Sequence, residues 1–389
     1  MISFNTLNLF LVDLLFFLPD KLVFIISGLI MSVAICTFLI GLGSVYTWFE
    51  RRVIARFQNR PGPNRWGPFG ILQPIADAVK LLIKEDIIPA TADKMVFIAA
   101  PIIFLCTTLL VYAFLPLGID SQLGNTNVAL LFVLGITSVN ALSVFMAGWA
   151  SRNKYATLGA IRAVAMLISY EVPMAISLMG IVMVSQSLSL VGIVNAQASI
   201  PFIILQPLGA MTFMIAAIAE MSRAPFDMIE SESELIGGYI TEYAGMKFAI
   251  FQLSEFLAPI FTASLFTVLF LGGSNSIKFL EFLPIPGILW FASKSFVITA
   301  ILLWFRSTWP RLRIDQIMSF AWKVLMPAAI LNTLLIGLEL VFIRDNYILQ
   351  IIINMSTFVV FIYLIANILG QKRLKLKEPV PSELANMDA

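Results

Sequence analysis

Nine stretches of the chain are apolar over lengths that can cross a bilayer. A helix rises 1.5 Å per residue, so about 20 apolar residues span the roughly 30 Å of hydrocarbon. Backbone groups in hydrocarbon need partners within their own segment, and this requirement predicts a helix for each stretch. The nine predicted spans are Leu22–Trp48, Met95–Leu115, Val128–Trp149, Gly159–Val184, Phe202–Ala219, Ala244–Leu271, Gly287–Phe305, Pro327–Ile343 and Tyr347–Leu369. The pattern indicates an all-α, polytopic integral membrane protein with eight core transmembrane helices and a ninth C-terminal helix.

The segments outside these spans complete the predicted organisation. Leu7–Leu18 is too short to span and contains Asp13, so residues 1–21 are predicted to form an N-terminal interfacial segment. Residues 22–343 form one membrane domain, residues 344–369 an additional C-terminal transmembrane helix, and residues 370–389 a polar tail.

The first connection contains a helical pattern of a different kind. From Ile71 to Glu85, apolar residues line one side, and four polar residues occupy the other: Gln73, Asp77, Lys80 and Lys84. This spacing predicts an amphipathic helix lying in the membrane surface. Two interpretations stay open here, a plain interfacial anchor and a surface at which a partner docks or a cavity opens.

Composition supports the membrane assignment and narrows the chemistry. Of 389 residues, 59% are hydrophobic and 12% charged, half the charged share of about 25% that soluble domains carry. The chain has no histidine, and its two cysteines, Cys36 and Cys106, lie in apolar runs. We therefore expect no metal site and no bound cluster, and proton chemistry carried by carboxylates. The balance of 25 basic against 23 acidic residues gives no reason to expect a nucleic-acid partner.

The basic residues predict the orientation of the chain. All but four of the 25 lie in the odd-numbered connections or the C-terminal tail. Because connections on the cytoplasmic or matrix side retain Lys and Arg, these connections and the tail are predicted to face inward and the N-terminus outward. A bacterial cytoplasmic (inner) membrane is the expected location, with the mitochondrial inner membrane as the alternative.

The fifth connection is strongly acidic. Within 23 residues, Arg223 is the single basic residue among six carboxylates: Glu220, Asp227, Glu230, Glu232, Glu234 and Glu242. Carboxylates crowded next to a low-dielectric membrane raise one another's pKa and can exchange protons near neutral pH. A solvated acidic loop without function is the alternative. The apolar residues interleaved with the acids favour a packed loop.

Two further acids lie deep inside predicted spans. Glu171 and Glu255 lie near the bilayer midplane, where a carboxylate costs roughly 2.5–3.5 kcal/mol to insert. Pro173 and Pro259 follow closely, and each removes one backbone donor, so we expect a local helix break beside each acid. A proton path and a protonated structural glutamate are both open, whereas Glu339, close to the outward end of its span, is interpreted as structural.

These motifs, in this order, resemble one family from about residue 22 to 343. The family is the quinone-site membrane subunit of proton-pumping NADH:quinone oxidoreductase, respiratory complex I, which is called subunit 1 in mitochondria and the H subunit in bacteria. The matching runs are Glu50–Arg52, Arg60–Asn64, Gly67–Asp77, Lys80–Glu85, Arg162–Glu171, Glu220, Arg223–Asp227, Glu230–Leu235, Glu242–Tyr243, Glu255 and Trp309–Gln316.

The resemblance implies roles for individual residues. The quinone chamber and its support match Asp77, Arg223, Phe226, Asp227, Glu220, Glu230, Glu232, Glu234 and Tyr243. The path that carries protons toward antiporter-like subunits matches Glu171, Glu255, Glu220 and Glu242. The loop surface that docks partner subunits matches Arg51, Arg60, Arg65, Lys80, Lys84, Arg311 and Arg313.

It also implies the cofactors and partners. Quinone is the substrate, while FMN and the iron–sulfur clusters belong to partner subunits, so the isolated chain is expected to be inactive. The expected partners are membrane lipid, peripheral iron–sulfur and quinone-site subunits on the inward face, small membrane subunits and antiporter-like subunits. Three alternatives stay open: a related subunit of a ferredoxin-fed oxidoreductase or membrane-bound hydrogenase, a stand-alone proton-coupled secondary transporter, and a purely structural anchor.

Overall fold

The computed structural model describes residues 19–118, 126–227, 237–276, 285–343 and 346–375. In this part of the chain, eight helices are long and apolar enough to cross a membrane. They are α2 (Asp20–Phe57), α4 (Lys94–Val111), α5 (Ala129–Ala150), α6 (Lys154–Ser185), α11 (Gly245–Phe270), α12 (Gly287–Thr308), α13 (Ile314–Phe320) continued by α14 (Met326–Phe342), and α15 (Tyr347–Lys375). The chain is therefore a polytopic, all-α membrane protein, as the apolar pattern predicted.

The fifth predicted span is the exception, because it is not one continuous helix. It is split at Gln206 into α8 (Phe202–Leu205) and α9 (Pro207–Glu220). Pro207 has no N–H and disfavours helical geometry at the residue before it, which explains the break. The Gln206 side chain donates to the Gly180 carbonyl of α6 at 3.1 Å, so the break is held inside the bundle.

Two other helices extend beyond their predicted ends. The first runs nine residues past the expected Trp48, to Phe57, and carries Glu50, Arg51 and Arg52 on its polar extension. The eighth predicted span begins earlier, since α13 and a π-helical turn (Ala321–Leu325) run directly into α14. Hydropathy located the apolar parts of these helices and not their polar continuations.

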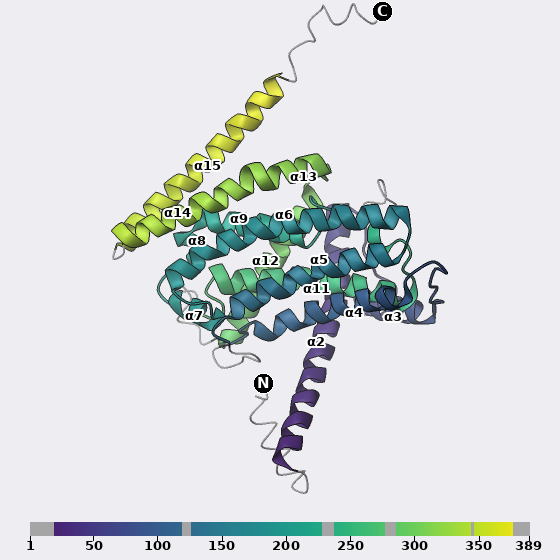
Figure 1. The fold of residues 1–389 in the computed structure, drawn as a ribbon. Coiled ribbons are helices and arrows are strands. Elements are labelled where there is room, and N and C mark those ends of the chain that lie inside the picture. The colour runs from purple at the N-terminus through teal and green to yellow at the C-terminus, as the bar shows by residue number, and fades with distance from the viewer. Residues whose placement is uncertain (1–18, 119–125, 228–236, 277–284, 344–345, 376–389) are drawn as a thin grey trace, which may run out of the picture.

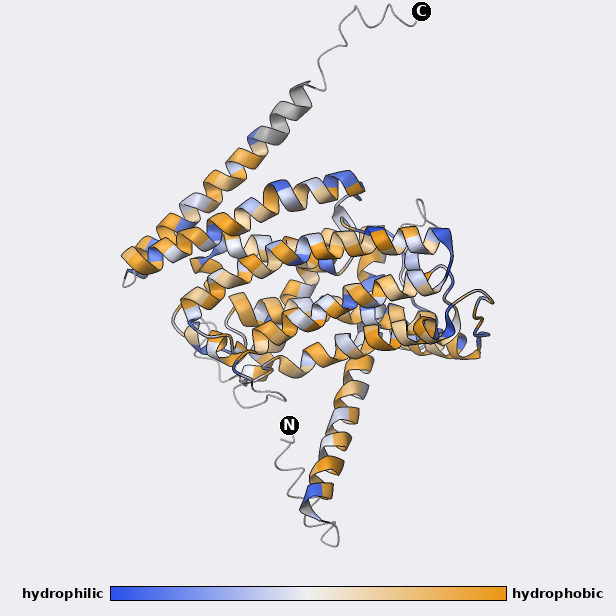
Figure 2. Ribbon diagram, viewed as in Figure 1, coloured by the Kyte–Doolittle hydropathy of each residue, from blue (hydrophilic) through white to orange (hydrophobic). Residues whose placement is uncertain are grey.

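The helices form a central bundle with a protruding helix on each side (Figure 1). α11 is the most enclosed span, and α4, α5, α6 and α9 gather around it or beside one another. α2 and α15 reach out of the bundle at opposite sides, and both are largely apolar along their length (Figure 2). Only 11% of the apolar stretch of α15 is buried inside this chain, so most of its surface is left uncovered by the bundle.

Buried polar contacts fix α15 to the bundle. It packs along α8, α9 and α14. Asn354 donates to the Glu339 carboxylate at 2.7 Å, and Gln350 donates to the Ile343 carbonyl at 2.8 Å. The side chains of Asn354, Glu339 and Gln350 are all buried, so Glu339 has a structural partner in the last helix.

Lys294 of α12 caps the C-terminal end of α11. Its ammonium donates to three backbone carbonyls, those of Leu271 at 2.8 Å, Gly273 at 3.1 Å and Asn275 at 2.7 Å. The last carbonyls of a helix lack intrahelical donors and carry partial negative charge. A lysine at this position supplies donors for hydrogen bonds and a positive charge. One side chain therefore holds α12, α11 and the turn after α11 together.

We expect Lys294→Met to destabilise the subunit by about 1–3 kcal/mol, the cost of leaving buried carbonyls unsatisfied. The measurement is the thermal unfolding midpoint of the solubilised complex. Lys323→Met, which removes an exposed ammonium, serves as the control and should leave the midpoint unchanged. Equal midpoints for the two variants would contradict the capping role.

Candidate functional site

A cavity of about 90 Å³, lined by both polar and apolar side chains, lies inside the helix bundle. Three glutamates from different helices face it: Glu171 of α6, Glu220 at the end of α9 and Glu255 of α11. The remaining lining residues include the polar side chains of Thr108, Thr137, Asn140, Ser222, Tyr239, Ser254 and Thr262. A cavity of this size has room for several water molecules, and the carboxyl, hydroxyl and amide groups on its wall are the partners that such water needs. Water at these groups would allow the three carboxyl groups to exchange protons.

Hydroxyl groups hold the three carboxyl groups in place. The Tyr239 hydroxyl donates to Glu255 Oε1 at 3.0 Å, and the Ser138 hydroxyl donates to Glu171 Oε1. Thr137 of α5 makes a side-chain hydrogen bond with Glu220. Each acid therefore has a partner from a neighbouring element, which is how buried carboxyl groups are kept in one orientation.

The two prolines near the deep acids do not interrupt their helices. α6 runs through Pro173, and α11 runs through Pro259. The expected local breaks are therefore wrong, although each proline still removes one backbone donor, for the carbonyls of Ser169 and Glu255. Packing on all sides keeps both helices continuous, since both prolines are buried.

The first residues of the fifth connection, up to Asp227, are packed, as the apolar residues among its acids predicted. Arg223 is buried, and its guanidinium lies 5.0 Å from the centre of the Phe256 ring. Phe226 is buried against Tyr170, with ring centres 5.2 Å apart. Asp227 pairs with Arg311 at 2.8 Å, which ties this connection to the loop before α13.

Other predicted members of this loop lie elsewhere or outside the described residues. Glu230, Glu232 and Glu234 fall in residues 228–236, which are not described. Glu242 accepts a hydrogen bond from Asn153, the residue before α6, at 2.6 Å and does not line the cavity. The structure thus brings together three of the four acids predicted for the proton path.

Tyr243 is buried just before α11, where it packs against α4. Its ring stacks on Phe97 with centres 4.0 Å apart and planes 2° apart, and its hydroxyl donates to the Phe97 carbonyl at 3.2 Å. Burial raises the pKa of Tyr243 well above its usual value. Its place in the structure is to fix the start of α11 against α4.

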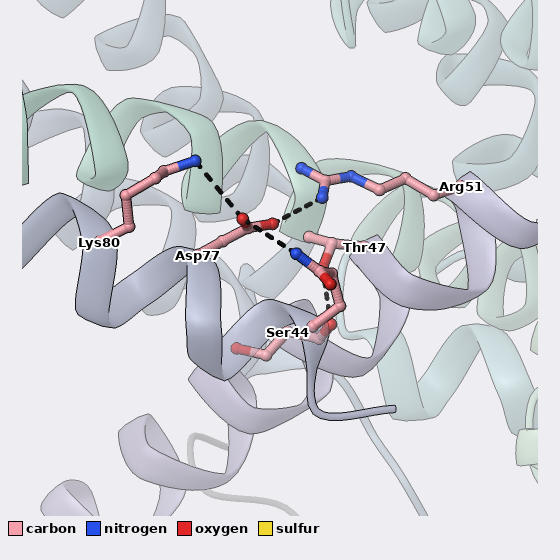
Figure 3. A network of polar contacts seen from close by, with 6 residues as sticks. Ser44, Thr47, Arg51, Asp77 and Lys80 are labelled. Atoms are coloured by element: carbon pink, nitrogen blue, oxygen red, sulfur yellow. Dashed lines mark hydrogen bonds and ion pairs between the residues drawn. The ribbon is translucent and has the colours of Figure 1, made fainter. Parts of the chain in front are cut away.

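Asp77 joins the amphipathic helix α3 (Gln73–Ile83) to the polar end of α2 (Figure 3). Its carboxylate pairs with Arg51 at 2.6 Å and with Lys80 at 3.4 Å, and it accepts from Gln73 at 3.4 Å. Partial burial raises the pKa of Asp77, but the hydrogen bond and charge of Arg51, with the charge of Lys80, outweigh burial and lower it. The amphipathic helix is present as predicted, with its apolar residues exposed.

The Pro/Gly-rich loop before α3 is pinned to the end of α2. The Phe69 carbonyl accepts from the Trp48 indole at 3.0 Å and from Arg52 at 2.7 Å. Gly70 adopts φ +78°, and a Cβ there would lie 2.3 Å from the Pro63 carbonyl oxygen, so only glycine fits this turn. The loop presents Trp66 and Phe69 as exposed aromatic side chains.

The seven basic residues predicted to dock partners are all exposed. They lie at the end of α2, in the following loop, on α3 and before α13: Arg51, Arg60, Arg65, Lys80, Lys84, Arg311 and Arg313. Exposed arginine and lysine on this scale form a surface that can bind acidic or polar groups of another protein.

Sequence reasoning missed one buried ion pair and the hydroxyl groups of the cavity. Glu50 of α2 is 2% exposed and accepts a hydrogen bond from Arg306 of α12. The only signal was a carboxylate directly after an apolar run. Ser138, Thr137 and Tyr239 gave no signal, because their roles arise only from the packing of α5, α6 and the loop before α11.

The comparison with known families decides the identity of this bundle. The family described as NADH dehydrogenase matches residues 29–337, most of the chain. The chain belongs to this family, which comprises subunit 1 of mitochondrial complex I and its bacterial counterparts. The match ends before α15.

Individual relatives agree with this assignment. The NADH-quinone oxidoreductase H subunit of Dehalococcoides mccartyi (strain CBDB1) is 43% identical over 358 residues, covering 91% of this chain and 99% of the relative. The corresponding H subunit of Bacillus thuringiensis (strain Al Hakam) is 48% identical over 290 residues, covering 74% of this chain and 86% of the relative. The chain is a membrane subunit of this enzyme complex, whose other subunits are its partners, and the hydrogenase and transporter alternatives fall away.

Proposed function

We propose that this subunit forms most of the quinone chamber of complex I, and that the cavity inside its helix bundle is the start of the path that couples quinone reduction to proton pumping. The observation that carries the proposal is the meeting of Glu171, Glu220 and Glu255 around one cavity, from three helices far apart in the sequence. Buried acids that face a polar space mark proton paths in membrane proteins.

The proposed chamber is built from Asp77 with its ion pairs and from the fifth connection. Met221 and Ser222 line the cavity, and Arg223, Phe226 and Asp227 follow directly, so the chamber loop begins at the cavity wall. Glu230, Glu232, Glu234 and Tyr243 belong to the same connection and are proposed to line or support the chamber, and Glu242 to extend the proton path.

The coupling follows from charge. Reduction of a quinone to hydroquinone takes up two electrons and two protons, and before the protons arrive the chamber gains negative charge. In a low-dielectric site, each added charge raises the proton affinity of nearby carboxylates and redistributes protons among them. FMN and the iron–sulfur clusters of partner subunits supply the electrons, and quinone is the substrate.

The subunit is proposed to contact partner subunits both on its inward face and within the bilayer. The seven exposed basic residues named above are proposed to dock the peripheral iron–sulfur and quinone-site subunits on the inward face. Small membrane subunits and antiporter-like subunits are the proposed partners within the bilayer. The membrane is proposed to be a bacterial cytoplasmic membrane.

A photoreactive quinone tests the chamber in the intact complex. We expect it to label peptides that contain Trp66–Phe69 or Arg223–Asp227, and excess unlabelled quinone to prevent the labelling. A control probe carries the same photoreactive group on an alkyl chain without the quinone ring and should label only lipid-facing helices. Labelling of neither peptide would favour a purely structural anchor.

Asp77→Asn is expected to slow quinone reduction by the same factor at every pH from about 5.5 to 8. The pKa of Asp77 is lowered by Arg51 and Lys80, so the carboxylate stays ionised over this range. The ion pairs of Asp77 stabilise the folded subunit fully above the pKa that aspartate has in the unfolded chain, about 3.9. This stabilisation is lost only as the pH falls through the lower pKa that Asp77 has in the folded subunit. The measurement is NADH:quinone reductase activity against pH, and a variant-to-wild-type ratio that changes between pH 6 and 8 would contradict the assignment.

A further inference from the structure

Tyr239 connects the fifth connection to a buried acid. It lies in the 3₁₀ turn η3 (Gly238–Ile240), between the chamber loop and α11, and it is 1% exposed. Its ring packs edge-on against Phe251 of α11, with centres 5.3 Å apart and planes 81° apart. Its hydroxyl donates to Glu255 Oε1 at 3.0 Å, and both side chains line the cavity.

The backbone of this turn is wedged against α6. Gly238 adopts φ +58°, and its carbonyl accepts from the Thr241 hydroxyl at 2.7 Å. A Cβ on Gly159 of α6 would lie 2.7 Å from Gly238 Cα and 3.2 Å from the Tyr239 nitrogen. The close contact between Gly159 of α6 and the backbone of Gly238 therefore fixes the position of Tyr239.

From this arrangement we propose that Tyr239 is a positioning residue, which holds Glu255 toward the cavity. The inference rests on the proposed function of the cavity. A hydroxyl that donates to a carboxylate favours its ionised form, so this contact sets how readily Glu255 takes up and releases protons.

The charged groups around Glu255 determine what the tyrosine adds. Glu171 faces the same cavity from α6, and Glu220 faces it from α9. The Arg223 guanidinium lies over the ring of Phe256, the residue after Glu255. Among the described residues that line the cavity, those contributed by α4 and α5 are uncharged. Where Glu171 and Glu220 are ionised, their negative charges oppose ionisation of Glu255, and the hydrogen bond from Tyr239 acts in the opposite direction.

Tyr239→Phe in the intact complex tests the inference, because it removes only the hydroxyl. We expect the pH profile of NADH-driven proton pumping in membrane vesicles to move to higher pH by about one unit, since the carboxyl group then holds its proton more tightly. Tyr112→Phe is the matched control. Tyr112 is also buried, but its hydroxyl donates to the Leu257 carbonyl at 2.7 Å and not to an acid, so its profile should stay at wild type.

A second variant changes the position of the turn while leaving the Tyr239 hydroxyl in place. Gly159→Ala pushes the Gly238 backbone away from α6 and should move the profile in the same direction. A wild-type profile for Gly159→Ala, or matching profiles for Tyr239→Phe and Tyr112→Phe, would overturn the inference. Glu255→Gln separates the role of Tyr239 from the proton path itself. If this variant stops pumping, the proton path through Glu255 stands even where Tyr239 has no role. If it pumps normally, the proposed path fails.

Discussion

Glu171→Gln is expected to lower NADH-driven proton pumping at least about 100-fold, the low end of what a positioned proton-transfer group contributes. Glutamine keeps the size of the side chain and its contact with Ser138 but cannot bind and release a proton. Quinone reduction should fall less than pumping, so that fewer protons are moved for each electron transferred. Electron transfer from NADH to a hydrophilic acceptor that takes electrons before the quinone should stay at the wild-type rate.

Glu339→Gln is the matched control for this variant. Glu339 is a buried carboxyl group of α14 that contacts Asn354 of α15 and does not line the cavity. Its variant should pump at the wild-type rate. Wild-type pumping by Glu171→Gln would show that the coupling role is wrong. Loss of pumping in both variants would show that pumping does not depend specifically on the carboxyl groups at the cavity.

Gly148→Ala is expected to reduce the amount of assembled complex severalfold. A Cβ at this position would lie 2.3 Å from Ala160 Cβ and 2.7 Å from the Ala156 carbonyl oxygen, so α5 and α6 must move apart. Overpacking of this kind costs about 1–3 kcal/mol. These two helices carry Thr137 and Glu171, so the cavity is distorted as well. The measurement is the yield and the thermal stability of the complex in membranes.

Gly135→Ala in the same helix is the control. Nothing lies within 4 Å of a Cβ built there. Alanine favours a helix over glycine by up to about 1 kcal/mol, so this variant should assemble at least as well as wild type. If the two glycine variants assemble equally well, close packing of α5 on α6 is not what positions the cavity walls.

The transmembrane helices were predictable from the sequence because lipid imposes a simple rule. Every span must be apolar and helical, so hydropathy alone located the apolar parts of the eight long helices. The rule says nothing of polar continuations, and the end of α2 at Phe57 was missed for that reason. The split at Gln206 also escaped prediction, because a proline inside a span can be absorbed, as Pro173 and Pro259 are.

The acids of the site were predictable, but their meeting was not. A carboxylate inside an apolar run is visible in the sequence, as Glu171 and Glu255 were. Their convergence with Glu220 depends on how α6, α9 and α11 cross, which no local pattern encodes. The pairing of Glu50 with Arg306, far apart in the sequence, was hidden for the same reason.

A comparison of proton-to-electron ratios among single and double variants tests the cavity most directly. Glu171→Gln, Glu220→Gln and the double variant are measured in the purified complex in proteoliposomes. If the two acids serve one path, each single variant lowers the ratio and the double variant is no worse than the worse single variant, since a path cut once cannot be cut again. Effects that multiply in the double variant, or a wild-type ratio in either single variant, would contradict a shared proton path through this cavity.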